Sequence, residues 1–100
     1  MAVDVTFLNK VKTALRVSFT LTAIDNQISD LIEEAILDLT ETADISPFTS
    51  ANADAMQTGA VIAYVSYKWF NDEKYFTSYN DMKTKMAVSG KYGGGVADEE

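Results

Sequence analysis

AIDNQISDLIEEAILDLTET, residues 23–42, is the stretch of sequence that decides the fold. Its apolar residues recur at the i, i+4, i+7, i+8 spacing of a helix that is buried along one side. The series continues for more than four turns and consists of Ile24, Ile28, Leu31, Ile32, Ala35, Ile36 and Leu39. Thr22 and Asp25 resemble a capping box at its start. The spacing therefore predicts a long amphipathic helix that packs against other elements.

Three further segments carry helical spacing, so the chain is predicted to be all-α. Residues 4–17 form the first predicted helix, which Asp4 caps, and its apolar face consists of Val5, Leu8, Val11 and Leu15. Residues 53–70 are apolar on nearly every side, which is typical of the central helix of a bundle. Gly59 inside this helix costs about 1 kcal/mol relative to Ala, which indicates that another helix crosses close by.

The C-terminal part of the chain is predicted to be a fourth helix followed by a flexible tail. The helix spans residues 73–88, and its apolar spacing comes from Tyr75, Tyr79, Met82 and Met86. Residues 89–100 hold four of the five glycines and an acidic end, a composition that does not support a packed structure. The expected organisation is one small bundle of about four helices, residues 1–88, and a tail, residues 89–100. Because apolar groups have no evident use in a solvated tail, we expect the tail to dock on a partner through Lys91, Tyr92 and Val96.

The composition argues against most kinds of chemistry. Among its 100 residues there is no His and no Cys, so the chain lacks thiolate metal ligands and a histidine base for a nucleophile. Acidic side chains on a helix can bind two metal ions in bundles, but those sites also use inward-facing histidines. We therefore expect no catalytic residue, no metal and no cofactor. The formal charge of −7 disfavours general binding to nucleic acid.

No membrane segment or export signal is expected. The apolar stretch at residues 59–67 lies in an uncharged run that extends from 55 to 67, which is far short of the ~20 apolar residues that a membrane span needs. The N-terminus has no apolar core of the kind found in a signal peptide. These features favour a soluble cytoplasmic protein.

Seven of the eleven aromatic residues lie between Tyr64 and Tyr79, interleaved with Lys68 and Lys74. This pattern has two interpretations. Bases of a single-stranded nucleic acid could stack on such side chains, but two lysines make a poor electrostatic groove. A protein core combined with a subunit interface fits better, because aromatic residues are enriched in both.

The distribution of charge points to assembly. Between Arg16 and Lys68 the chain has eight acidic residues and no Lys or Arg. Asp30, Glu34 and Asp38 follow each other at four-residue spacing, where like charges repel by roughly 0.2–0.5 kcal/mol per pair. Either water and salt or a basic surface must compensate them, and the candidate bases are Lys10, Lys12 and Arg16 or Lys83, Lys85 and Lys91. If a second copy supplies the bases, the contact is head-to-tail and makes rings. The predicted oligomer interface consists of Lys10, Lys12, Arg16, Asp30, Glu33, Glu34 and Asp38.

The order of the helices resembles a known family. VKTALRV at residues 11–17 is followed by DNQISDLIEEAILDLTETADI at 25–45 and AVIAYVSYKWF at 60–70. Together these segments resemble the small head-tail connector proteins of tailed bacteriophages, also called head-completion or DNA-packaging adaptor proteins. The likeness covers about residues 7 to 72.

The resemblance implies a structural role. Family members form a ring of about twelve copies beneath the portal, which extends the channel for DNA and offers a platform for the tail or its stopper protein. DNA would pass through the ring without sequence-specific binding. The expected location is the head-tail junction of the virion, and the host cytoplasm before assembly. An alternative from another class is an acidic helical adaptor or regulator that binds a single cellular protein partner as a monomer or dimer.

Overall fold

A computed structural model describes residues 4–17, 21–89 and 91–92, and most of these residues are helical. The elements in chain order are α1 (Val5–Leu15), α2 (Thr22–Ala43), α3 (Ala55–Phe70) and α4 (Glu73–Ser89). Each observed boundary lies within two residues of the boundary that the apolar spacing predicts. The all-α prediction is confirmed.

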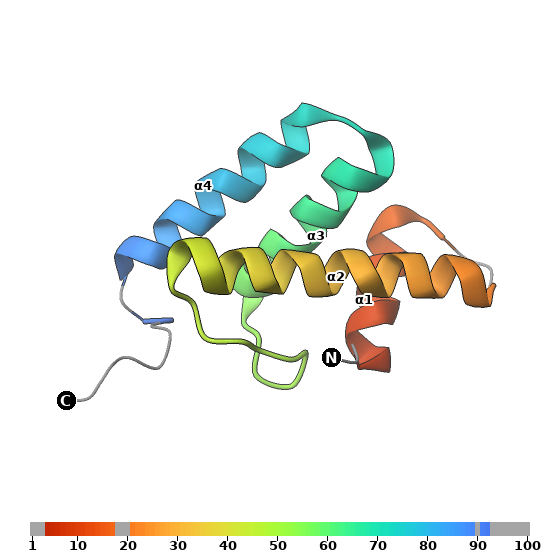
Figure 1. Cartoon of the computed structure of the whole chain (residues 1–100), viewed down its shortest axis with the longest axis horizontal. Coiled ribbons are helices and arrows are strands. Elements are labelled where there is room, and N and C mark those ends of the chain that lie inside the picture. The colour runs from red at the N-terminus through yellow and green to blue at the C-terminus, as the bar shows by residue number, and fades with distance from the viewer. Residues whose placement is uncertain (1–3, 18–20, 90, 93–100) are drawn as a thin grey trace.

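The helices pack around α3 (Figure 1). α3 and α4 run antiparallel as a hairpin, and α2 lies across them. α1 packs against α2 and α3. α2 and α3 both contact every other helix, but the two largest helix interfaces, with α4 and with α2, both involve α3, which explains why α3 is apolar on nearly every side. The prediction that residues 53–70 form the central helix is therefore confirmed.

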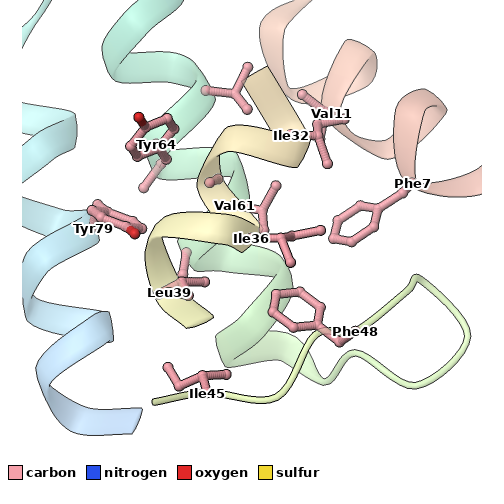
Figure 2. Packing of buried hydrophobic residues seen from close by; sticks show 14 of the residues in the cluster. Phe7, Val11, Ile32, Ile36, Leu39, Ile45, Phe48, Val61, Tyr64 and Tyr79 are labelled. Atoms are coloured by element: carbon pink, nitrogen blue, oxygen red, sulfur yellow. The ribbon is translucent and has the colours of Figure 1, made fainter. Parts of the chain in front are cut away.

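The core contains residues from all four helices and from the loop between α2 and α3 (Figure 2). α2 contributes the largest set of fully buried aliphatic side chains, and Ile45 and Phe48 of the loop close the lower end of the core. The buried residues of α2 are Ile28, Ile32, Ala35, Ile36 and Leu39. All of them belong to the apolar stripe that the sequence predicts.

Two local predictions at the N-terminal end of the chain are wrong. Val5 was expected on the core face of α1, but its side chain is 68% exposed and Phe7 is buried in its place. Val11 and Leu15 of the predicted face are buried and Leu8 packs against the core, so the prediction fails only at the first position of the helix. The capping box at Thr22 is absent, since α2 begins at Thr22 itself and Leu21 caps it without a side-chain hydrogen bond. Asp25 instead lies 2.8 Å from the ammonium nitrogen of Lys12.

Aspartates cap α1 and α3, and both side chains also bind a residue from a distant part of the chain. Asp4 caps α1 by accepting a 2.8 Å hydrogen bond from the amide of Phe7, as predicted. It also accepts a 2.6 Å hydrogen bond from the hydroxyl of Ser50 in the loop, and this bond lowers the pKa of Asp4. Asp54 and Gln57 form a reciprocal capping box at the start of α3.

Non-glycine residues end three of the helices. Arg16, Asp44 and Asn71 follow α1, α2 and α3 with positive φ values of 62°, 55° and 55°. A residue in this left-handed conformation commonly ends a helix, although glycine adopts the conformation with the lowest conformational energy.

Gly59 marks the close crossing that the sequence predicts. A Cβ atom at Gly59 would lie 3.2 Å from the sulfur of Met82, so α4 packs directly on this point of α3. The absence of a side chain at Gly59 allows Met82 to fill the space between the two helices.

Candidate assembly surfaces

One edge of α2, which we call the inner edge, carries Glu34, Asp38 and Thr42 and faces α3 and α4. Asp38 accepts a hydrogen bond from the hydroxyl of Tyr79 and one of 3.3 Å from the ammonium group of Lys83. Lys83 also donates a 3.1 Å hydrogen bond to the hydroxyl of Thr42. These contacts give Asp38 two donors from α4, so its charge is compensated within the chain.

Two tyrosine hydroxyls also donate hydrogen bonds to the acids of the inner edge. Tyr64 and Tyr79 meet edge-to-face with ring centroids 5.1 Å apart. Burial raises the pKa of Tyr64, and the nearby carboxylate of Glu34 raises it further through its negative charge and through a hydrogen bond. Burial also raises the pKa of Tyr79, with a second contribution from its hydrogen bond to Asp38. Both tyrosines therefore stay neutral and serve as donors to acids of α2.

Four of the candidate basic residues have an acidic partner in the same chain. Lys12 pairs with Asp25 across α1 and α2, with 11% and 21% of the two side chains exposed. Lys83 pairs with Asp38. The remaining pairs are Lys85 with Asp81 and Lys91 with Asp54. The basic surface that compensates Asp25 and Asp38 therefore belongs to the same chain, whereas Lys10 and Arg16 on and after α1 remain exposed.

The side of α2 that turns away from the buried stripe, which we call the outward face, lies next to the inner edge and keeps Asp30 and Glu41 in solvent. Asp30, Leu37 and Glu41 are exposed along it, and Glu33 beside them is half-buried. Leu37 is 55% exposed although it lies in the middle of the helix. The helical spacing of the buried stripe could have revealed this residue, because Leu37 falls on the side away from Ile32, Ile36 and Leu39. An exposed leucine among acids distinguishes the outward face from an ordinary solvated helix surface.

The turn between α3 and α4 forms an aromatic corner made of Tyr67, Phe70, Tyr75 and Phe76. Phe70 stacks beside Tyr75 with ring centroids 5.8 Å apart, and Tyr67 contacts Phe76 at 4.7 Å. Phe70 is 48% exposed and Phe76 is 37% exposed. The aromatic cluster that the sequence assigns to core and interface is thus divided, with Tyr64 and Tyr79 buried and the corner partly in solvent.

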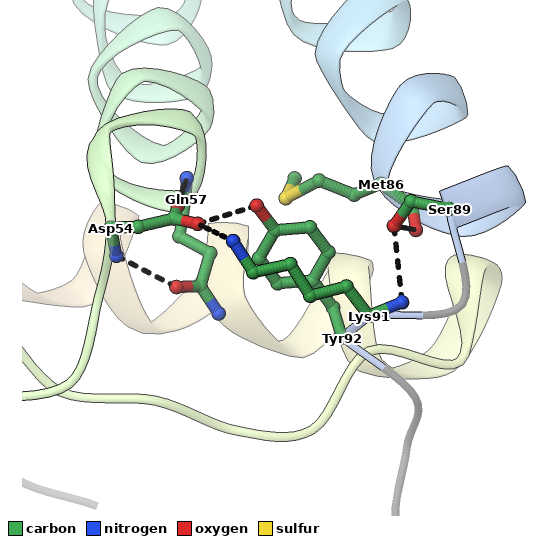
Figure 3. A network of polar contacts seen from close by, with 6 residues as sticks. All are labelled: Asp54, Gln57, Met86, Ser89, Lys91 and Tyr92. Carbon is green, nitrogen blue, oxygen red and sulfur yellow. Dashed lines mark hydrogen bonds and ion pairs between the residues drawn. The ribbon is translucent and has the colours of Figure 1, made fainter.

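The residues that follow α4 return to the start of α3 (Figure 3). There the side chains of Lys91 and Tyr92 both donate hydrogen bonds to the carboxylate of Asp54, and we call these three residues the C-terminal clasp. The hydroxyl of Tyr92 donates to the carboxylate of Asp54, which lowers the pKa of Asp54 and raises that of Tyr92. The amide of Ser46 donates a 3.0 Å hydrogen bond to the carbonyl of Tyr92. Lys91 and Tyr92, predicted to dock on a partner, thus already contact this chain. Val96 lies outside the described residues.

A shallow pocket of about 360 Å³ lies beside the clasp, between the α2–α3 loop and Tyr92. Elsewhere, the described residues include no group of three or more acidic or other ligating side chains that could bind a metal ion. Within the same residues, none of the helices combines the length and the apolar character needed to cross a bilayer.

A family model described as phage connector protein matches residues 7–92 of the chain. The chain belongs to the phage connector protein family. The match spans all four helices and ends at Tyr92, so the family domain includes the clasp as well as the bundle. A connector is a structural component of the phage particle, and this chain therefore has a structural role of that type. No curated protein and no solved structure matches this connector.

Proposed function

We propose that this connector assembles with further copies of itself into a ring at the head-tail junction, beneath the portal protein. The observation that carries the proposal is the family match over residues 7–92, which reaches from α1 to the clasp. In this role the ring extends the DNA channel from the portal towards the tail and offers a platform to the tail or stopper protein. DNA passes through it without sequence-specific contacts.

The charge of the chain supports the role of a channel. A net charge of −7 gives the assembled ring an acidic surface, which repels the phosphates of DNA and leaves the cargo free to move. The outward face of α2 concentrates part of this charge in Asp30 and Glu41. Such a face is available either to the channel or to a neighbouring copy.

The contact between copies uses the outward face of α2 and a basic surface of the next copy. Asp38 and Lys12, which the sequence places in the interface, already pair within the chain. Glu34 faces Tyr64 at the inner edge. Asp30 therefore remains as its exposed acidic member, joined by Glu41. Lys10 and Arg16, on and after α1, and Lys68 on α3 are exposed bases that are available to these acids, whereas Lys74 lies 3.9 Å from Asp72 of its own chain.

Residues beyond the clasp contact the adjacent component of the junction. Val96 is the apolar residue that the acidic C-terminal end offers for this contact. Deleting residues 93–100 while keeping Tyr92 should leave the melting temperature unchanged and weaken binding to the ring neighbour, the portal or the tail component.

Mixing the purified connector with the portal protein of the same phage tests the main proposal. Sedimentation velocity should show a complex of one portal with many connector copies, and electron microscopy should show a ring coaxial with the portal. The connector alone, at rising concentration, serves as the control. A connector that stays monomeric or dimeric and does not bind the portal would contradict the proposal and favour an adaptor that binds a single partner.

A further inference from the structure

We propose that the C-terminal clasp is exchanged between copies: Lys91 and Tyr92 leave Asp54 while the four helices stay folded, and the same two residues of a neighbouring copy take their place. This inference rests on the proposed ring, because assembly is what brings a second copy close enough to compete. It adds a contact in which each copy binds the next through a site that the single chain already fills.

The carboxylate of Asp54 uses its two oxygens for two separate purposes (Figure 3). Oδ1 accepts a 2.9 Å hydrogen bond from the amide of Gln57, and the amide of Asp54 donates to the side chain of Gln57 at 2.8 Å. Oδ2 accepts a hydrogen bond from the hydroxyl of Tyr92 and one of 3.4 Å from the ammonium group of Lys91. The clasp can therefore open at Oδ2 while Oδ1 continues to cap α3.

The contacts that hold Lys91 and Tyr92 on the bundle are polar and partly exposed. The side chain of Lys91 is 70% exposed, and an exposed ion pair contributes little to stability. Tyr92 lies half-buried at the edge of the core, and its carbonyl accepts a 3.0 Å hydrogen bond from the amide of Ser46. α4 itself is anchored by Tyr79 and Met86, which are both fully buried. A segment held in this way opens locally while the core beneath it stays folded.

An open clasp leaves a site whose polar and apolar groups match a tyrosine. The pocket beside the clasp is lined by Pro47 and Phe48 of the loop and by Tyr92 itself, so the departure of Tyr92 adds the volume of its ring to the pocket. Oδ2 of Asp54 is then available to a phenolic hydroxyl, and the amide of Ser46 to a backbone carbonyl. Tyr92 shows that one peptide segment makes both of these contacts at once.

A second copy carries the segment whose fit to this site the structure demonstrates. Its Lys91 and Tyr92 would make the contacts that are present within one chain, so exchange costs little. A short tether gives the chain's own segment an effective concentration on the order of millimolar, which keeps the clasp closed in the free connector. Copies held side by side in a ring present their segments at comparable local concentration, and exchange then competes with closure.

The absence of cysteine allows exchange to be measured in the full-length connector. Asn52→Cys and Lys91→Cys each replace an exposed residue that lines the pocket, and both variants keep Tyr92. The two single variants, one of them labelled with ¹⁵N, are mixed, assembled on the portal protein and treated with a short thiol-to-thiol cross-linker. Mass spectrometry should find heterodimers, because a clasp closed within one chain cannot link the two variants. Before assembly, the same mixture should remain largely monomeric.

A matched mixture controls for chance contact between copies. Asn26→Cys also replaces an exposed asparagine, but near the start of α2, at the opposite end of that helix from the pocket. Mixed with Lys91→Cys and assembled in the same way, it should give no heterodimers above the level of the unassembled mixture. Equal yields from the two mixtures, or no heterodimers from the Asn52 mixture, would overturn the exchange.

A peptide tests the vacated site without a second copy. The peptide SGKYGGGVADEE, residues 89–100, is titrated into the full-length Tyr92→Ser connector while the amide resonances of Ser46 and Gln57 are followed by NMR. Binding to the wild-type connector should be at least about tenfold weaker, because its own Tyr92 fills the site. A peptide with Phe in place of its Tyr should also bind more weakly, since Asp54 then lacks its donor. No binding to the variant, or equal binding to both connectors, would overturn the inference.

The ring and the exchange can fail separately. Circular dichroism checks the helix content of each variant, and Tyr92→Phe, which keeps the ring and loses only the hydroxyl, replaces Tyr92→Ser if the latter unfolds. If rings form on the portal but the Asn52 mixture gives no heterodimers, the exchange is wrong and the proposed function stands. If the peptide binds Tyr92→Ser but the connector never assembles, both the exchange between copies and the proposed function are wrong.

Discussion

The two sides of α2 carry the same types of residue but differ in what surrounds them. At the inner edge, Asp38 is compensated by Tyr79 and Lys83 of α4, and Glu34 faces the buried Tyr64. On the outward face, Asp30 and Glu41 remain exposed beside Leu37. The comparison teaches that the number of acids in a helix does not determine how many of them need a partner from another molecule. The neighbouring helices decide this, and here they compensate Asp38 and contact Glu34 while Asp30 and Glu41 stay exposed.

The largest difference in stability is expected between variants of two leucines that lie two residues apart on α2. Leu39 is fully buried, so Leu39→Ala should lower the free energy of unfolding by about 2–5 kcal/mol. Leu37→Ala removes the same atoms from an exposed position and should change it by less than about 0.5 kcal/mol. Chemical denaturation of the isolated connector measures both. Equal losses in the two variants would mean that the outward face is covered within the monomer.

A smaller difference in stability is expected between alanine variants of two aspartates of α2. Asp38→Ala leaves the hydroxyl of the buried Tyr79 without its acceptor and Lys83 without its carboxylate, which should cost about 1–3 kcal/mol of stability. Asp30→Ala should be neutral within about 0.5 kcal/mol. Assembly should respond in the opposite sense, since Asp30 lies on the proposed interface. Normal assembly of Asp30→Ala, Glu41→Ala and the double variant would argue against a charged contact between copies.

The smallest effect is expected at alkaline pH, where the tyrosines of the inner edge should respond together with Tyr92 of the clasp, whose pKa is also raised. The pKa values of Tyr64 and Tyr79 are raised in the folded state, chiefly by burial and then by the acids of α2. A raised pKa means that the stabilising contribution is complete below the unfolded value of about 10 and is lost as the pH rises above it. The free energy of unfolding should therefore decline above about pH 10. Tyr79→Phe should reduce this decline, whereas Tyr75→Phe, which keeps both inner hydroxyls, should not.

The fold could be predicted because the apolar spacing of each helix is long and regular. Ile28 to Leu39 define the buried side of α2 without ambiguity, and the apolar composition of residues 53–70 identifies the central helix. The start of α1 could not be predicted as well. Val5 and Phe7 are both apolar and near a helix end, and only the packing of Phe7 against Phe48 of the loop decides which of them is buried.

The candidate surfaces could be predicted only in part. Acidic residues on α2 are visible in the sequence, but the tyrosines that bind them are 30 to 41 positions further along the chain, and their helices had to be placed first. The same holds for Lys12 and Asp25, which lie on different helices. The exposure of Leu37 and of the aromatic corner could have been predicted from helical spacing. Leu37 falls outside the predicted core stripe of α2, and the corner lies at the ends of two helices.

The C-terminal clasp limits how far the last residues of the connector can reach. With Tyr92 held by Asp54 and Ser46, every later residue is tethered at that point rather than at the end of α4. Val96 follows four residues later, and four residues span at most about 14 Å when fully extended. Any site that accepts Val96 while the clasp is closed must therefore lie within this radius of Tyr92, close to the loop between α2 and α3. A more distant site would become accessible only after Tyr92 leaves Asp54.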